Sequence, residues 1–117
     1  MKKRTRAFAL RCLKLVASFP KGKVGDVIGR QLIRAATSVA ANYSATCRAR
    51  SHADFLHKLG IVEEEADESI FWIDFAPDAD LAKRDLVHAL LQEGQEILAI
   101  IVAARKTAKA RKPVPKR

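Results

Sequence analysis

Apolar residues recur every three or four positions in four long segments of the chain, and short polar stretches separate these segments. The spacing places the apolar side chains on one face of an α-helix, because a helix turns once in about 3.6 residues. The segments cover roughly residues 3–18, 25–48, 51–76 and 80–108. The pattern predicts an all-α protein whose four helices share one interior.

The breaks between the segments predict how the helices are connected. Pro20 and the glycines beside it end the first helix, and Ser51 caps the start of the third, with Asp54 placed to complete a capping box. Because the connections are short, we expect an antiparallel up-down-up-down four-helix bundle. It forms one domain over residues 1–110, followed by a basic and flexible tail over residues 111–117.

Composition agrees with a single helical domain. The chain has 117 residues, of which 49% are apolar, but only five glycines and four prolines. A β-sandwich would need more turn residues than these.

The positive charge lies mainly at the two ends of the chain. The formal net charge is +9, and residues 1–14 and 105–117 contain no acid. In the expected bundle both ends reach the same pole, together with the helix junction that reads "CRARSHADF". Such a pole favours a polyanion, although the same charge can serve solubility. The candidate contacts to a nucleic-acid backbone are Arg4, Arg6, Arg48, Arg50, Arg105, Lys106 and Lys109.

A run of acids, "EEEADES", occupies the middle of the third predicted helix. Antiparallel packing brings Arg34 level with Asp67, so Arg34 and Arg30 are expected to pair with Asp67, Glu68 or Glu64. Ion pairs of this kind fix the register of two helices more than they stabilise them. We interpret the acids as structural rather than catalytic.

The aspartate, histidine and cysteine residues show no spacing that indicates a catalytic site. The spacing Asp54-x-x-His57 and Asp85-x-x-His88 resembles half of a dinuclear metal site, but the two histidines are expected about 18 Å apart along the bundle. Cys12 and Cys47 are too distant for a disulfide. We expect no metal, no cofactor and no enzymatic activity; a metal-dependent enzyme is the least favoured alternative.

Three aromatic residues, Phe71, Trp72 and Phe75, stand close together near the end of the third helix. The core stripe there already uses Ile70 and Ile73, so Trp72 and Phe75 should project from it. Exposed aromatic residues in a row are typical of an interface with another chain. No apolar run approaches the length of about 18 residues that suggests a membrane span, and no secretory segment is evident, so we expect a cytoplasmic protein.

The segment Gln31–Asp74 resembles the bacterial four-helix-bundle family that is also called the large-subunit ribosomal RNA intervening-sequence protein family. The resemblance rests on "IRAATSV", "RARS-ADF" and "EEADES-FW", in order and with matching spacing, and it extends from about residue 8 to residue 109. Asn42, Glu64 and Glu68 fall on positions typical of the family. Ala40 departs from it, since many members carry proline there.

This resemblance implies a four-helix bundle that assembles as a homopentamer. A related branch of the family serves as an accessory protein of reverse transcriptases in retroelements, where a basic pentamer binds RNA and the polymerase. The expected function is therefore a scaffold or accessory factor that binds RNA or DNA backbones without base selectivity. The alternative is a protein-interaction module that docks on an acidic protein and has no nucleic-acid role.

Overall fold

The computed structural model describes residues 1–111, which form four α-helices and no strand. The helices are α1 (Lys2–Ala17), α2 (Lys23–Thr46), α3 (His52–Asp78) and α4 (Arg84–Ala110). This confirms the expected all-helical fold with four helices. Of the predicted tail, residues 112–117 lie outside the described part of the chain.

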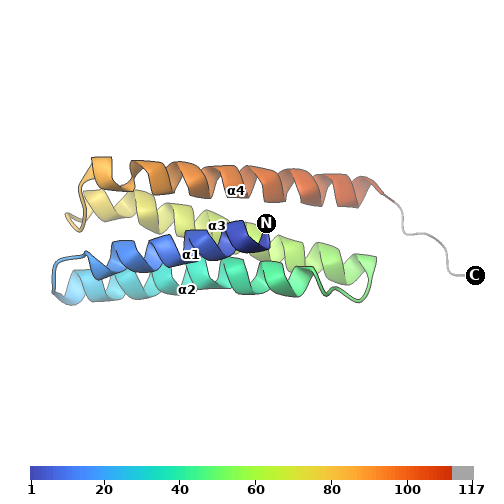
Figure 1. The fold of residues 1–117 in the computed structure, drawn as a ribbon, viewed down its shortest axis with the longest axis horizontal. Coiled ribbons are helices and arrows are strands. Elements are labelled where there is room, and N and C mark those ends of the chain that lie inside the picture. Colours follow the sequence, from blue (N-terminus) through green and yellow to red (C-terminus); the bar gives the residue numbers. More distant parts are fainter. Residues whose placement is uncertain (112–117) are drawn as a thin grey trace, which may run out of the picture.

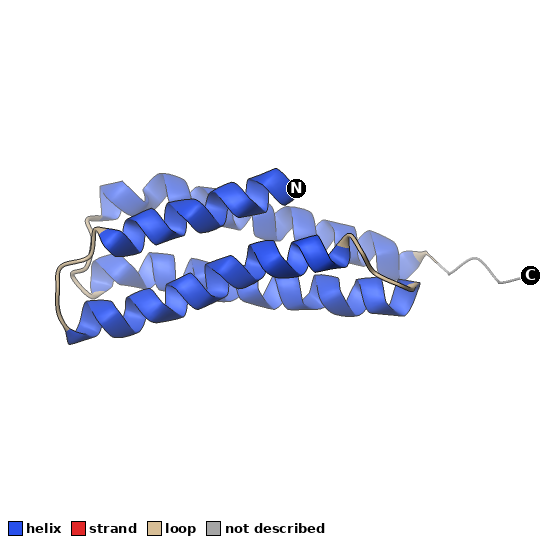
Figure 2. Ribbon diagram, turned by 60° about the horizontal axis from the view of Figure 1, so that its bottom comes forward, coloured by secondary structure: helices blue, strands red, loops and turns tan. Residues whose placement is uncertain are grey.

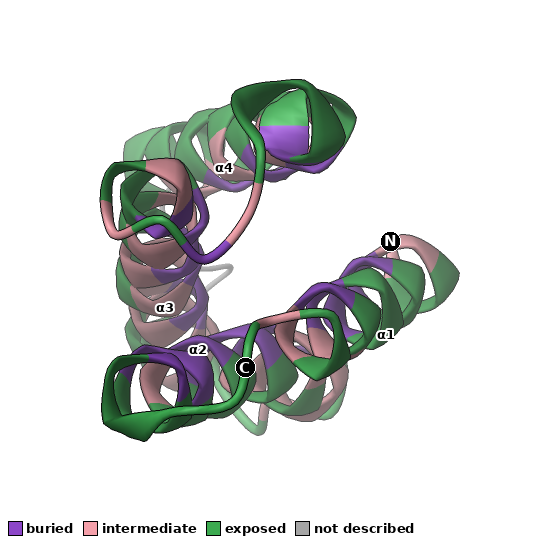
Figure 3. Cartoon of the chain, turned by 90° about the vertical axis from the view of Figure 1, so that its left-hand side faces the viewer, coloured by how far each residue is buried: buried purple, intermediate pink, exposed green. Residues whose placement is uncertain are grey.

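The chain reverses direction at each of its three connections, so the helices lie side by side along one axis (Figure 1). The connections alternate between the two ends of the bundle (Figure 2). Each helix packs on the next in sequence, and α1 and α4 close the ring with the weakest of the four interfaces. Viewed along the axis, the buried residues of all four helices turn toward a common interior (Figure 3).

One main cluster forms the core, and it uses the residues that the apolar stripes predict. Phe8, Leu32, Leu59, Ile97 and others are almost completely excluded from solvent. Burying one such large side chain stabilises the fold by about 1.5–3 kcal/mol, so this cluster holds the four helices together.

The α2–α3 connection is fixed by the residues expected to cap α3. The Ser51 hydroxyl accepts a hydrogen bond from the Asp54 amide at 3.0 Å, and the Asp54 carboxylate accepts one from the Arg50 amide at 3.1 Å. Lys58 Nζ lies 2.8 Å from the same carboxylate. The pKa of Asp54 is lowered, first by its hydrogen bond to Lys58 and then by that to the Arg50 backbone.

Helix α3 ends two residues later than predicted, because its last turn tolerates Pro77. The amide of Leu81 donates to the Ala76 carbonyl and that of Asp80 to the Pro77 carbonyl, which is the hydrogen-bond pattern of a Schellman motif. Asp80 takes the left-handed conformation this motif requires, with φ of 59°. Leu81 then packs with Ala76 in a second small cluster, and α4 begins only at Arg84.

Helix α1 is much shorter than α4, with 16 residues against 27. Its first turn lies near the middle of α4, not at the end (Figure 1). The basic segments 1–14 and 105–111 therefore do not meet at one pole, contrary to the prediction. Since Arg4 is level with Glu93 and Glu96, about 15 Å of α4 separates it from Arg105.

Candidate nucleic-acid interface

Positive charge is divided between the two halves of the bundle. Residues 1–53, which contain α1 and α2, carry twelve lysines and arginines and a single acid, Asp26. All other acids lie between residues 54 and 96, on α3, α4 and the loop between them. One side of the bundle is thus strongly basic, whereas the other side carries mixed charges.

Five of the described cations form ion pairs with carboxylates, and these are Arg4, Arg34, Lys58, Arg84 and Arg105. Two of the five, Arg4 and Arg105, are among the backbone-binding candidates. A carboxylate within hydrogen-bond distance offsets the charge that a phosphate would meet. The two paired arginines are therefore weaker candidates than the sequence suggests.

Arg4 connects the first helix with the last. Its guanidinium donates to both carboxylate oxygens of Glu93, at 2.9 and 2.7 Å, and to Glu96 at 3.0 Å. These hydrogen bonds raise the pKa of Arg4 further, and the hydrogen bond from Arg4 is the main reason that the pKa of Glu93 is lowered. Arg4 contributes to the α1–α4 interface.

Arg105 lies against the backbone of α3. Its guanidinium is 3.4 Å from Glu63, and a Cβ atom at Gly60 would come within 3.3 Å of it. The Arg105 Nε is buried without a hydrogen-bond partner in residues 1–111. Gly60 thus leaves room for this side chain, a role that the sequence pattern did not indicate.

The remaining candidates have no carboxylate partner in the described part of the chain, and they are Arg6, Arg48, Arg50, Lys106 and Lys109. All five are exposed. Arg48 donates a hydrogen bond of 3.2 Å to the Ser44 hydroxyl, which turns it back along α2. Lys2 and Lys3 are also exposed and form no ion pair within residues 1–111, although they were not among the candidates predicted from the sequence.

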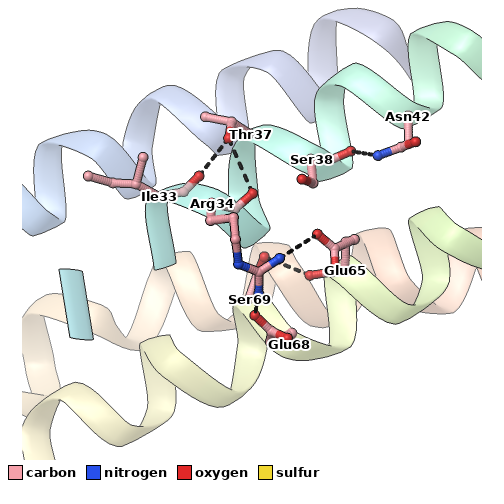
Figure 4. A network of polar contacts seen from close by, with 8 residues as sticks. All are labelled: Ile33, Arg34, Thr37, Ser38, Asn42, Glu65, Glu68 and Ser69. Carbon is pink, nitrogen blue, oxygen red and sulfur yellow. Dashed lines mark hydrogen bonds and ion pairs between the residues drawn. The ribbon is translucent and has the colours of Figure 1, made fainter. Parts of the chain in front are cut away.

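The acid run on α3 pairs with α2, but not through all the expected residues. Arg34 bonds to Glu65 at 3.3 Å and also to Glu68, which was expected (Figure 4). Glu65 and Glu68 stand three residues apart and so face α2 together.

Three of the residues expected in this cluster stand outside it. Arg30, Glu64 and Asp67 are exposed and form no ion pair within residues 1–111.

Asn42, which falls on a position typical of the family, donates a hydrogen bond to the Ser38 carbonyl at 2.9 Å. This bond keeps its side chain on α2 (Figure 4).

The prediction that Trp72 and Phe75 project from the core stripe is wrong for Trp72 and confirmed for Phe75. Trp72 is half-buried and packs against both core clusters, so it does not project from the bundle. Phe71 and Phe75 are the exposed members, 54% and 39% accessible, and their rings stack at 5.7 Å. The core face is wider here than a narrow stripe implies, because Trp72 packs against the second cluster, formed by Ile28, Ala76 and Leu81.

Helix α4 also exposes apolar side chains, namely Leu86, Ile100 and Val102. By length and composition it meets the criterion for a membrane span, with mean hydropathy 1.4 over 18 residues, which the sequence analysis did not expect. Its other face is buried in the core, and Glu93 pairs with α1. Helix α4 is therefore one wall of the bundle, and its exposed apolar side chains stand singly among polar ones.

The thiols and histidines form no common site. Cys12 is buried and Cys47 exposed. Burial raises the pKa of the Cys12 thiol to about 12. Within residues 1–111, no three side chains of histidine, cysteine, aspartate or glutamate gather closely enough to hold a metal ion.

Comparison with known proteins places this geometry in context. The chain matches the family model described as "23S rRNA-intervening sequence protein" over residues 1–103. It is also similar to a crystal structure from Bacteroides thetaiotaomicron, described as a protein with unknown function from the S23 ribosomal protein family. The TM-score is 0.80 with 27% sequence identity, over 90% of this chain and 97% of that one. A comparison with curated proteins gave no match.

Proposed function

We propose a function for this chain, which belongs to the 23S rRNA-intervening sequence protein family: it is a non-enzymatic scaffold or accessory protein that binds RNA or DNA backbones. The observation that carries the proposal is the near-absence of acids in residues 1–53, which leaves most cations of α1 and α2 without an ion pair in the part of the chain that the structure describes. We call the surface formed by α1, α2 and the junction at residues 47–51 the basic face.

The basic face suits a phosphate backbone better than a base edge. Its cations are exposed lysines and arginines, and the aromatic residues of α1, α2 and the loop between them, Phe8, Phe19 and Tyr43, all pack on the core. Stacking on single-stranded bases requires accessible rings, so binding should depend on charge. It should weaken steeply with salt and show little sequence preference.

The first experiment measures binding of nuclease-treated, high-salt-washed protein to duplex DNA, single-stranded DNA and hairpin RNA over a salt series. We expect binding at low salt with a steep negative salt slope. The double variant Arg48→Glu/Arg50→Glu should bind more weakly and with a shallower slope.

The matched control is Lys21→Glu/Lys83→Glu, which reverses two unpaired charges near the other end of the bundle. Equal losses in both variants would remove the junction from the interface. An intact wild-type protein that binds none of the three probes at low salt would refute the proposal and favour an acidic protein as the partner.

We also propose that the chain assembles with copies of itself, in the pentamer that the family resemblance implies. The exposed and stacked Phe71–Phe75 pair supports self-association, because exposed apolar surface of this kind marks interfaces. Light scattering should give five times the mass of one chain. Phe71→Ser/Phe75→Ser should lower that mass, and a monomeric wild-type protein would exclude the assembly.

A further inference from the structure

A pocket of about 450 Å³ opens on the basic face, between the first turns of α1 and the C-terminal half of α2. Lys2, Lys3 and Arg6 line it from the α1 side. Its volume falls within the range of about 300–1,000 Å³ that is usual for small-molecule sites. The pocket is therefore large enough for more than a single ion.

No acid opposes the three cations of this pocket. Its lining contains no carboxylate, and none of the three forms an ion pair in the described part of the chain. The first turn of α1 contains no acid and has no side-chain cap. Three unopposed positive charges around one concave surface favour an anion, and the arginine suits a phosphate because its guanidinium can donate two parallel hydrogen bonds.

The α2 side of the pocket adds a donor and an apolar wall. Ser44 lines the pocket, and its hydroxyl oxygen accepts the hydrogen bond from Arg48, so its own hydrogen remains for another acceptor. Ser44 thus contacts both the pocket and Arg48, the first basic residue of the junction. Ala40 and Ala41 form a small apolar surface beside these polar groups.

We propose that this pocket holds one nucleotide of a bound nucleic-acid strand. The phosphate lies between Lys2, Lys3 and Arg6, with Ser44 donating to it, and the sugar packs on Ala40 and Ala41. This inference rests on the proposed function and deepens it. The pocket would give a bound strand one fixed anchor, whereas the rest of the basic face attracts the strand only by charge. The strand then continues past Arg48 toward the α2–α3 junction.

The experiment compares two variants of equal charge, with a single-stranded oligonucleotide as the probe. Lys2→Gln/Lys3→Gln/Arg6→Gln neutralises the pocket. Arg11→Gln/Lys14→Gln/Lys23→Gln removes three other unpaired cations from the same two helices. We expect the pocket variant to bind at least about tenfold more weakly than the wild type and the control variant less than about threefold, because only the pocket cations would donate hydrogen bonds directly to a phosphate, whereas the control cations would act through the general field.

A second pair of variants tests the pocket without touching its cations. Ala41→Glu places a carboxylate in the pocket, whereas Ala89→Glu adds one to the exposed side of α4. Ala41→Glu should lower affinity about tenfold and Ala89→Glu less than about twofold. Circular dichroism of all variants checks that the helices remain folded.

The outcomes separate this inference from the proposed function. Wild-type binding with equal losses in both variants of each pair would overturn the pocket and leave a diffuse basic face. No wild-type binding to any nucleic acid would overturn the proposed function and the pocket with it. Selective loss in the pocket variants would establish the anchor.

Discussion

Helix α1 contacts α2 on one side and α4 on the other, and the two interfaces are built differently. Toward α2 the helices approach closely, since a Cβ atom at Gly29 would lie only 2.6 Å from Val16 Cγ1. Toward α4 the Phe8 ring lies over Gly94, and Arg4 bridges to Glu93 and Glu96. A groove of about 280 Å³, lined in part by Leu86 and Leu90, separates the two helices further along.

This difference decides which charges of α1 remain available to a ligand. Arg4 and Arg6 are two residues apart and so lie on nearly opposite sides of the helix. Arg4 meets two carboxylates of α4, whereas Arg6 lines a pocket that contains none. Net charge alone therefore describes the binding surface poorly, and each cation has to be judged by its neighbours.

The largest expected effect comes from closing the space between α1 and α2. Gly29→Ala gains the helix propensity of alanine but forces Val16 aside within a packed interface. Gly60→Ala gains the same propensity and meets only the end of the flexible Arg105 side chain. We expect the first variant to be less stable than the second by about 1–3 kcal/mol in urea unfolding.

The difference between the two alanine variants isolates the packing cost, because the propensity term is common to both. Equal stabilities would mean that α1 shifts freely on α2, and the proposed contrast between the two interfaces would fail.

The sequence predicted the four helices well because each depends on local periodicity and on nearby caps such as Ser51 and Asp54. It did not predict the partners of Arg4, which lie 89 and 92 residues away. Their level on α4 depends on where α1 starts along the bundle, and the packing of Phe8 over Gly94 sets that position. Periodicity carries no information about such an offset between the first and the last helix.

The same limit applies to Trp72 and to the pocket. A helical stripe shows which residues share a face, but not how wide the buried face becomes when a second cluster forms at one end. In the sequence, nothing distinguishes Lys2 and Lys3 from the other basic residues near the N-terminus. Only the short α1 brings them beside Ala41 and Ser44 of α2.

An intermediate effect is expected from Cys12, which is fully buried on the inner side of α1. Burial raises the pKa of its thiol to about 12, against an ordinary value of 9.0. As the pH rises, the thiol of the unfolded chain therefore loses its proton before the thiol of the folded chain. The contribution of Cys12 to the free energy of unfolding is fully present below pH 9.0 and is lost as the pH rises toward 12. At pH 10 the loss attributable to Cys12 should be about 1.4 kcal/mol.

Unfolding of reduced wild type and Cys12→Ala between pH 8 and pH 10.5 measures this loss. The variant lacks the titrating thiol but retains Cys47, Tyr43 and the lysines, so its stability should fall less steeply. Parallel curves would show that the folded protein does not raise the pKa of the Cys12 thiol, and that water reaches this part of the core.

The smallest effect should come from the ion pair that closes the α1–α4 interface. The pKa of Glu93 is lowered mainly by the hydrogen bond from Arg4, so its contribution is present above the ordinary carboxyl pKa of 4.5 and is lost as the pH falls below it. Glu93→Gln should lower the free energy of unfolding by about 0.2–1 kcal/mol at pH 7, since Arg4 is partly exposed and keeps its ion pair with Glu96.

The matched control is Glu64→Gln, because Glu64 is exposed and forms no ion pair within residues 1–111. The gap between the Glu93 variant and the wild type should narrow as the pH falls below 4.5 and shrink in 1 M salt, because both conditions weaken the attraction to Arg4. A gap that persists under both conditions would mean that the side chain supports α1 through its shape, and the two sides of α1 would then differ in packing rather than in charge.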